Sequence, residues 1–281
     1  MITARPESTI GIGWRPELAL MISRRAGVGF VEVVAENIDP HAIPLPVKQL
    51  RERGVEVIPH GVSLSLGGAD PLDRSRADAL SRLAIELGSP FASEHVAFVR
   101  AGGIETGHLL PVPRTSDSLD VLVSNVLAAK SVLPVPLALE NIATLFEWPE
   151  PEMDEATFLA EALERTDTLL LLDISNLYAN SRNHKFDPLL FLDRLPLDRL
   201  AYLHIAGGVE RHGLYHDTHA HAIPRGALEL LEELCARVTP PGVLLERDDH
   251  FPAEAEIEAE LDEIAASVKR GSLRREAARE S

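Results

Sequence analysis

Eight short apolar segments, spread along almost the whole chain, constrain its fold more than any other feature. Several are apolar at nearly every position, as in the stretches LLLLDI and GVLLE. Continuous apolar runs of this kind are typical of strands that are buried on both faces of a parallel sheet. The predicted strands are Thr9–Trp14, Phe30–Ala35, Val55–Pro59, Phe91–Phe98, Leu137–Glu140, Leu169–Ile174, Leu200–Ile205 and Val243–Glu246.

Helical patterns fill the gaps between these strands. A first helix is expected to open at Pro16, and further ones over Leu72–Leu87, Ser116–Leu133, Glu152–Arg165, Pro224–Val238 and Pro252–Lys269. Repeated strand–helix units predict a single α/β domain, a (β/α)8 TIM barrel, because a doubly wound sheet usually stops at about five or six strands. We therefore assign residues 1–270 to the barrel. The charged residues 271–281 are expected to form a frayed C-terminal tail.

Composition narrows the class of protein further. The 44 acidic residues outnumber the 27 basic ones and give a net charge of −17, which disfavours nucleic acid as a partner. The sequence contains no run of roughly eighteen uncharged apolar residues, so we expect no membrane-spanning helix. The N-terminus lacks the apolar core of a signal peptide. A single cysteine, Cys235, is typical of a protein from a reducing cytoplasm.

Most of the predicted strands end in a residue that can bind a metal ion. In (β/α)8 enzymes the carboxyl ends of the strands surround the active site, so we expect these side chains to meet. Mixed histidine and carboxylate ligands suit zinc, iron or manganese. The candidates are His60, His95, Glu140, Asp173, His204 and Glu246 at strand ends, with Asp217 and His219 in the loop after the seventh strand.

This ligand set exceeds what one ion needs, so we expect two or three ions. Glu140 is the expected bridge, because its strand lies between the other ligand-bearing strands. One predicted site then contains His60, His95 and Glu140, and a second contains Glu140, Asp173, His204 and Glu246. A third has Asp217 and His219 and needs another ligand, for which Asn176 and His184 are both candidates.

Polar residues beside these positions have two possible roles. Glu36, Asn37, Glu94 and Asn141 could bind substrate or orient the ligands, and ordinary hydrogen bonding at strand ends is an equal alternative. Asp248 follows Glu246 at the rim of the predicted barrel and is expected to be a solvated loop residue.

The order of ligands resembles two groups of metalloenzymes. One is the xylose-isomerase-like and endonuclease IV-like barrels, although Asn176 stands where the endonuclease pattern has a histidine. The closer resemblance is to the DUF692 family, also called UPF0276, of methanobactin-biosynthesis-type multinuclear non-heme iron oxygenases. Its motifs are matched at Gly11–Arg15, Glu36-Asn37, His60–Ser65, Ser93–His95, Leu110–Thr115, Leu139–Asn141, Asp173–Tyr178, Asn183-His184, His204–Gly207 and Asp217–His219.

The second resemblance implies a reaction class. It implies an oxidoreductase that holds two or three iron ions and uses dioxygen to modify cysteines of a ribosomally synthesised precursor peptide. A small partner protein is implied that binds the leader of this peptide. We expect Glu140, Asp173, His204 and Asn176 to take part in catalysis.

Two other functions remain open on the same ligands. One is a zinc- or manganese-dependent hydrolase, phosphodiesterase or sugar isomerase, in which the metal activates water or polarises a carbonyl. The other is a non-catalytic barrel that binds a partner. Buried carboxylates and imidazoles with no metal to satisfy them argue against the latter.

Overall fold

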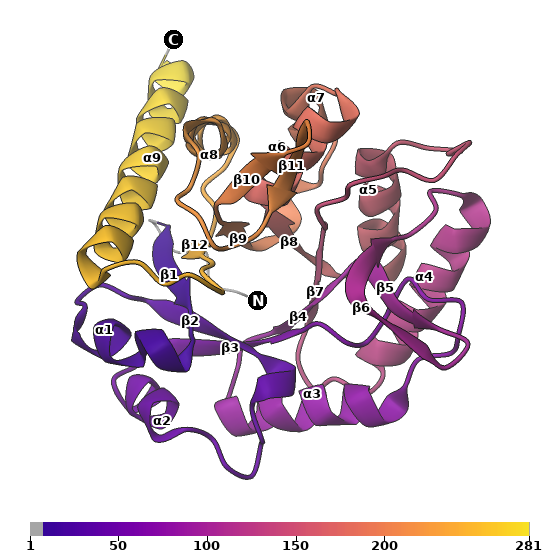
Figure 1. Cartoon of the computed structure of the whole chain (residues 1–281), viewed down its shortest axis with the longest axis horizontal. Helices are drawn as coiled ribbons and strands as arrows, with labels where there is room; N and C mark the ends of the chain where they lie inside the picture. The colour runs from indigo at the N-terminus through magenta and orange to yellow at the C-terminus, as the bar shows by residue number, and fades with distance from the viewer. Residues whose placement is uncertain (1–7, 281) are drawn as a thin grey trace.

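The chain forms a closed barrel of eight parallel strands. The computed structural model describes residues 8–280. The strand order around the barrel is β1-β12-β9-β8-β7-β4-β3-β2 (Figure 1). Barrel strands that follow one another along the chain are therefore neighbours in the barrel, and the last one closes it against the first. The barrel strands are β1 (Thr9–Gly13), β2 (Phe30–Val34), β3 (Glu56–Gly61), β4 (Ala92–His95), β7 (Leu137–Glu140), β8 (Leu169–Asp173), β9 (Leu200–Ile205) and β12 (Gly242–Leu245). The predicted (β/α)8 barrel is confirmed.

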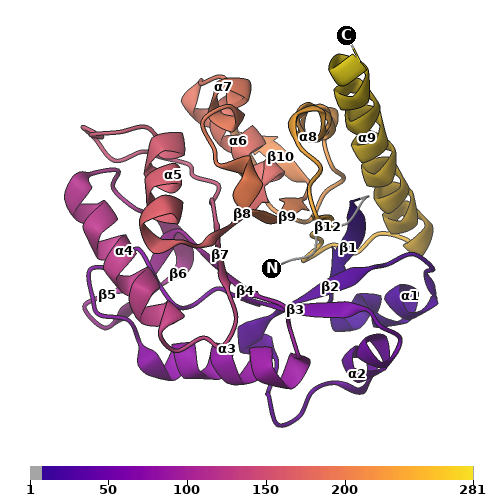
Figure 2. The same ribbon diagram turned by 180° about the vertical axis from the view of Figure 1, so that it is seen from behind.

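Helices surround the strands on all sides, as both views show (Figures 1 and 2). Several begin at a side chain that accepts hydrogen bonds from the first free amides: Asp73, Thr115 and Asp154 cap three of them. The helices are α1 (Ala19–Arg24), α2 (Leu45–Glu52), α3 (Arg74–Leu87), α4 (Ser116–Lys130), α5 (Glu155–Thr166), α6 (Ile174–His184), α7 (Pro188–Leu192), α8 (Arg225–Arg237) and α9 (Glu254–Glu280). Within residues 8–280, no helix combines the length and apolar character needed to cross a membrane.

The barrel strands are buried on both faces, and each face has a different partner. One large apolar cluster joins the strands to the helices. A smaller cluster, which includes Phe30, Ile58, Leu171, Tyr202 and Leu244, fills the barrel interior. Side chains on a strand alternate between its two faces, so the residue two positions after each of these interior residues also points into the barrel. In each case that second residue is polar. A polar layer therefore lies next to the apolar interior layer, towards the carboxyl ends of the strands.

Two hairpins that the sequence did not predict lie outside the barrel. They are β5 (Ala97–Ala101) with β6 (Ile104–Pro111), and β10 (Gly208–Arg211) with β11 (Leu214–Asp217). The predicted strand Phe91–Phe98 is therefore two strands, because the barrel strand ends at His95 and the chain then turns into the first hairpin. The second hairpin ends at Asp217 and carries that residue back to the barrel.

The C-terminal segment also differs from expectation. We expected residues 271–281 to be frayed, but α9 continues as a helix through Glu280 and packs along α8. Gly271 is buried against Cys235, and a Cβ atom on it would lie 2.5 Å from that side chain. Arg274 pairs with Glu233 at 2.8 Å, and Arg275 donates a hydrogen bond to the Cys235 carbonyl. The charges of this segment therefore bind α8, which keeps it helical.

Candidate metal centre

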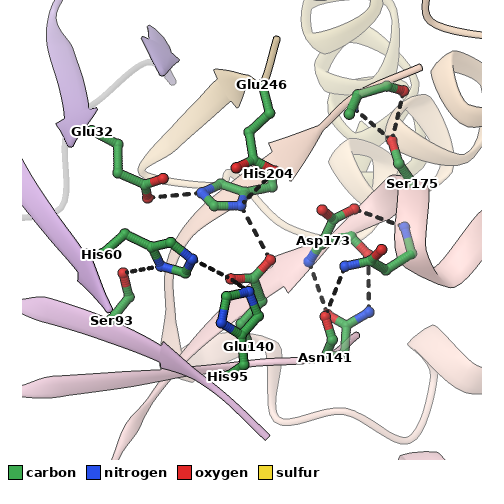
Figure 3. A network of polar contacts seen from close by, with 12 residues as sticks. Glu32, His60, Ser93, His95, Glu140, Asn141, Asp173, Ser175, His204 and Glu246 are labelled. Atoms are coloured by element: carbon green, nitrogen blue, oxygen red, sulfur yellow. Dashed lines mark hydrogen bonds and ion pairs between the residues drawn. The ribbon is translucent and has the colours of Figure 1, made fainter. Parts of the chain in front are cut away.

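The predicted ligands come together at the carboxyl ends of the barrel strands. Figure 3 shows the side chains of His60, His95, Glu140, His204 and Glu246 pointing towards one another. In each of three groups, candidate ligand atoms lie within 4.8 Å of one another: His60, His95 and Glu140; Glu140, Asp173, His204 and Glu246; and Asp173, Asp217 and His219. A fourth group contains His219, Glu246 and Asp248.

The strand register explains why these residues meet. His95 on β4 stands opposite Glu140 on β7, and Asp173 on β8 stands opposite His204 on β9. Glycine makes room beside them: a Cβ atom on Gly61 would lie 2.9 Å from a carboxylate oxygen of Glu94. The barrel therefore sets the ligand-type side chains at one level.

Glu140 occupies the middle of this layer. Its Oε2 atom lies 3.4 Å from Nε2 of His60 and 3.4 Å from Nε2 of His95. Its Oε1 atom lies 3.2 Å from Nδ1 of His204. The two oxygens of one carboxylate thus face two different groups of nitrogen atoms.

Several carboxylate oxygens in this layer are buried and accept no hydrogen bond. They are Oε2 of Glu140, Oδ2 of Asp173, Oδ1 of Asp217 and Oε2 of Glu246. Burying a carboxylate oxygen without a partner is costly. All of these atoms belong to residues of the groups above, where a divalent cation would satisfy them. The donor set, histidine nitrogen and carboxylate oxygen without thiolate, fits zinc, iron or manganese.

The ring nitrogens that point away from Glu140 have polar partners. Nδ1 of His60 lies 2.9 Å from Oγ of Ser93, and Nδ1 of His95 lies 3.3 Å from Oε1 of Glu94. Nε2 of His204 lies 2.8 Å from Oε2 of Glu32. Histidine ligands in metal sites commonly donate their second ring N–H in this way. The opposite nitrogen of each ring faces Glu140.

Carboxylates control the pKa values of most of these histidines. Burial lowers the pKa of His95, but Glu140 and Glu94 outweigh it and raise the pKa to about 9. Burial also lowers the pKa of His204 and His219, and in both cases Glu246 and a second carboxylate outweigh it and raise the pKa well above the ordinary value. These carboxylates therefore favour the protonated forms of His95, His204 and His219 when no cation is bound.

The pKa values of two carboxylates in the site are shifted in opposite directions. Burial, together with Asp217 and Glu140, raises the pKa of Asp173 well above its ordinary value. Burial also raises the pKa of Glu246, but His204 and His219 outweigh it and hold the pKa well below that value. A cation that entered the site would displace these protons, as metal ligands must be deprotonated.

The third group is completed by Asp173, which was not among the residues considered for that role. Asn176 donates its side-chain amide to the Asn141 carbonyl, and its backbone N–H caps the helix through Oδ1 of Asp173. His184 contacts the Thr144 hydroxyl at 2.7 Å and lies 3.8 Å from Glu147, so the structure does not bring it to Asp217 and His219.

His219 can join either of two groups. Its Nε2 atom lies 2.6 Å from Oδ2 of Asp217, and its Nδ1 atom lies 3.0 Å from Oδ2 of Asp248. Asp248, expected to be merely solvated, is 40 % exposed but pairs with both Arg15 and His219. The ring nitrogen of His219 without a proton is the one that can bind a metal ion. The position of that proton therefore decides whether His219 joins the group with Asp217 or the group with Asp248.

The residues considered for substrate binding have mainly local contacts. Glu36 and Asn37 are exposed, and Glu36 accepts a hydrogen bond from the Val62 amide. Asn141 is buried, and its side-chain amide forms hydrogen bonds with both the backbone N–H and the carbonyl of Asp173. Asn141 therefore fixes the position of a candidate ligand, and a substrate role for Glu36 and Asn37 stays a prediction.

Sequence reasoning missed Glu32, which is 1 % exposed and contacts His204. It lies in the middle of an apolar strand, whereas most of the predicted ligands lie at strand ends. A signal was available: Glu32 follows the interior residue Phe30 by two positions, just as His60 follows Ile58 and His204 follows Tyr202.

Comparison with known proteins identifies close relatives. Residues 9–269 match the family described as "RiPP precursor modification enzyme MbnB/TglH/ChrH", where RiPP denotes a ribosomally synthesised and post-translationally modified peptide. A UPF0276 protein of Streptomyces avermitilis is 52 % identical over 271 residues, which cover 94 % of this chain and 56 % of that relative. This chain thus spans little more than half of that protein. A UPF0276 protein of Caulobacter vibrioides is 36 % identical over 278 residues, or 97 % of this chain and 99 % of the relative.

Solved structures share the fold at low identity. Endonuclease IV from Thermus thermophilus superimposes with a TM-score of 0.61 at 20 % identity, covering 93 % of this chain and 99 % of that one. D-Psicose 3-epimerase from Clostridium cellulolyticum gives a TM-score of 0.60 at 13 % identity, covering 95 % and 99 %. These likenesses confirm the barrel type and say nothing of the reaction. By its sequence match, the chain belongs to the MbnB/TglH/ChrH family of RiPP precursor modification enzymes.

Proposed function

We propose that this protein is a multinuclear non-heme iron oxygenase that modifies cysteine residues of a ribosomally made precursor peptide with dioxygen. The family supplies the peptide as the substrate class. The observation that carries the metal proposal is Glu140, whose two buried carboxylate oxygens face separate groups of histidines. Two or three ions are proposed, with zinc or manganese as the alternative metals.

The proposed ligands divide among the ions by distance. His60, His95 and Glu140 would hold one ion, and Glu140, Asp173, His204 and Glu246 a second. Asp173, Asp217 and His219 would hold the third. Iron bound there would supply redox chemistry with dioxygen and would lower the pKa of a nearby substrate thiol.

Cys235 is not a candidate for the substrate thiol. The chain has one cysteine, Cys235, and it is buried in α8. Burial raises the pKa of this thiol to about 12, so it stays protonated and unreactive. A cysteine of the precursor peptide is therefore the thiol that we propose to be modified.

The loop after β7 is the proposed contact region for the peptide or a small leader-binding partner protein. It begins directly after Glu140, and its side chains Leu145, Phe146 and Trp148 are 48 %, 44 % and 39 % exposed. The Phe146 and Trp148 rings pack edge to face, 5.5 Å apart. Exposed apolar side chains beside a site commonly mark a binding surface.

The proposal has a genetic and a biochemical test. A short cysteine-bearing reading frame and a gene for a small leader-binding protein should lie beside this gene. The peptide encoded by the short reading frame should change in mass when it is incubated in air with the iron-loaded enzyme and the partner. The reaction should consume dioxygen. The same peptide with its cysteines replaced by serine should not change. Full dioxygen consumption and mass change with the serine peptide would contradict a cysteine-directed reaction.

A further inference from the structure

Three buried side chains beneath the proposed ligands connect two histidines that belong to different groups. They are Glu32 on β2, Ser93 on β4 and Tyr202 on β9, each at most 1 % exposed. None of them belongs to the proposed ligand groups. They lie inside the barrel: Tyr202 belongs to the apolar cluster of the interior, and Glu32 and Ser93 follow the interior residues Phe30 and Phe91 by two positions.

These side chains form an unbroken chain of hydrogen bonds. Oε2 of Glu32 lies 2.8 Å from Nε2 of His204 and also accepts a short hydrogen bond from the Tyr202 hydroxyl. The Tyr202 oxygen lies 2.9 Å from Oγ of Ser93. Oγ of Ser93 lies 2.9 Å from Nδ1 of His60. Figure 3 shows the two ends of this chain, Glu32 against His204 and Ser93 against His60.

The donors of this chain can point in only one direction when Glu32 is a carboxylate. A carboxylate oxygen accepts, so the single proton of the Tyr202 hydroxyl is committed to Glu32. The Ser93 hydroxyl must then donate to the Tyr202 oxygen, and its own oxygen is left to accept from Nδ1 of His60. At the other end, Nε2 of His204 donates to the same Glu32 oxygen.

We propose that Glu32, acting through Tyr202 and Ser93, sets the tautomers of both His60 and His204, so that one carboxylate outside the ligand set aims ring lone pairs at two ion positions. With a metal ion bound, Nε2 of His60 and Nδ1 of His204 would be the ring nitrogens without a proton, and these are the atoms that face Glu140. Glu32, Tyr202 and Ser93 are positioning residues. The inference rests on the metal centre of the proposed function.

Loss of the Tyr202 hydroxyl breaks the chain at one defined link. Without that acceptor, the Ser93 proton can turn towards Nδ1 of His60, which favours the tautomer with a proton on Nε2, facing the ion. The bond from His204 to Glu32 is untouched. The ring itself stays packed against Phe30 and Phe91, at centroid distances of 5.7 and 5.4 Å, so Tyr202→Phe should preserve the fold.

Zinc binding with histidine spectroscopy tests the proposal without any activity assay. Zn²⁺ is titrated into metal-free wild type, Tyr202→Phe and the control Tyr178→Phe, in competition with a coloured chelator. Tyr178 lies on α6, where its ring packs against Tyr215, and its hydroxyl has no part in the chain of Glu32. Long-range ¹H–¹⁵N spectra of the zinc-loaded proteins then report which ring nitrogen of His60 and His204 carries the proton.

In Tyr202→Phe we expect one zinc equivalent to bind about tenfold more weakly, the usual effect of losing a partner behind a ligand. The ¹⁵N shifts of His60 should change, while His204 keeps its proton on Nε2. Tyr178→Phe should match wild type. Glu32→Gln, which keeps an acceptor oxygen, should lie closer to wild type than Glu32→Leu, which should disturb both histidines.

Each contrary result has a distinct meaning. If Tyr202→Phe binds zinc like wild type with unchanged His60 shifts, the positioning chain is overturned and the metal centre stands. If wild type binds no zinc, the metal centre fails and the positioning role fails with it. Should Tyr202→Phe not fold, Ser93→Ala removes the last link to His60 and is judged by the same affinities and shifts.

Discussion

Replacing Glu140 by alanine should remove more than one metal equivalent. Glu140 is 1 % exposed, and its oxygens lie 3.4 Å from His60 and His95 and 3.2 Å from His204. Its loss leaves the first group with His60 and His95 alone and takes one ligand from the second. His95→Ala is the matched control, because His95 belongs to the first group only and its loss should cost a single equivalent.

The size of the effect follows from linkage between binding and folding. An ion present at about a thousand times its dissociation constant stabilises the folded state by about 4 kcal/mol. For a domain of this size, each kcal/mol shifts the melting temperature by about 2–4 °C, so one ion accounts for about 10 °C. The metal-dependent rise in melting temperature should therefore be about 10 °C smaller in Glu140→Ala than in His95→Ala.

The assay compares metal content by mass spectrometry with thermal unfolding of loaded and chelated samples. The chelated sample of each variant is its own baseline, which removes any effect of the substitution on the metal-free fold. Equal metal loss and an equal rise in melting temperature for the two variants would refute the shared role of Glu140. A Glu140→Ala protein that retains all of its metal would refute its role as a ligand.

Four further predictions follow from other parts of the molecule. Zinc affinity of the metal-free protein should fall at least about tenfold per pH unit below pH 9, because the proton held by His95 must leave; affinity that is flat from pH 9 to 6.5 would contradict this. Burial raises the pKa of Glu155 to about 7, so the folded state loses stability as pH rises from 4.5 through 7. Glu155→Gln should thus be about 2 kcal/mol more stable than wild type to urea at pH 8, with the difference vanishing towards pH 5. Gly271→Leu should destabilise the protein by about 1–3 kcal/mol by forcing α9 away from α8, and an unchanged melting temperature would show that this contact is not made. His184→Ala should keep the full metal content, and loss of one equivalent would restore His184 as a ligand.

Most of the strands were predictable because they are apolar at nearly every position, as in Leu169–Asp173 and Gly242–Leu245. Two of the predicted strands, Leu137–Glu140 and Leu200–Ile205, match the structure at both ends. The others except Phe91–Phe98 differ by one or two residues at one end or at both. The two hairpins were not predicted because they lie outside the core. Ile104, at the turn of the first hairpin, is 72 % exposed. Such strands depend on pairing with one another, which apolar content does not reveal.

The gathering of the strand-end residues was also predictable, because a barrel brings all its carboxyl ends to one side. The ligands of the third group were not predictable, because they depend on a loop and on the N-terminus of α6. Asp173 uses one oxygen to cap α6 and leaves the other free, while Asn176 turns to the Asn141 carbonyl. No spacing rule distinguishes these outcomes before the chain is folded.

Charge alone misled the interpretation of the C-terminal segment. A stretch rich in arginine and glutamate, with Leu273 as its one large apolar residue, suggests a solvated end. In the structure those arginines reach acceptors on α8, such as Glu233 and the Cys235 carbonyl, and the small Gly271 lets the two helices approach. The partner residues are about 40 positions away in sequence, so the pattern of the segment itself does not indicate them.

The metal content of anaerobically purified protein tests the central claim most directly. Glu140 and the ligands around it predict two or three iron ions per chain, measured by mass spectrometry against protein concentration, with more than one of them lost in Glu140→Ala. Zinc as the sole bound metal, or a single ion of any kind in the wild-type protein, would contradict a multinuclear iron centre.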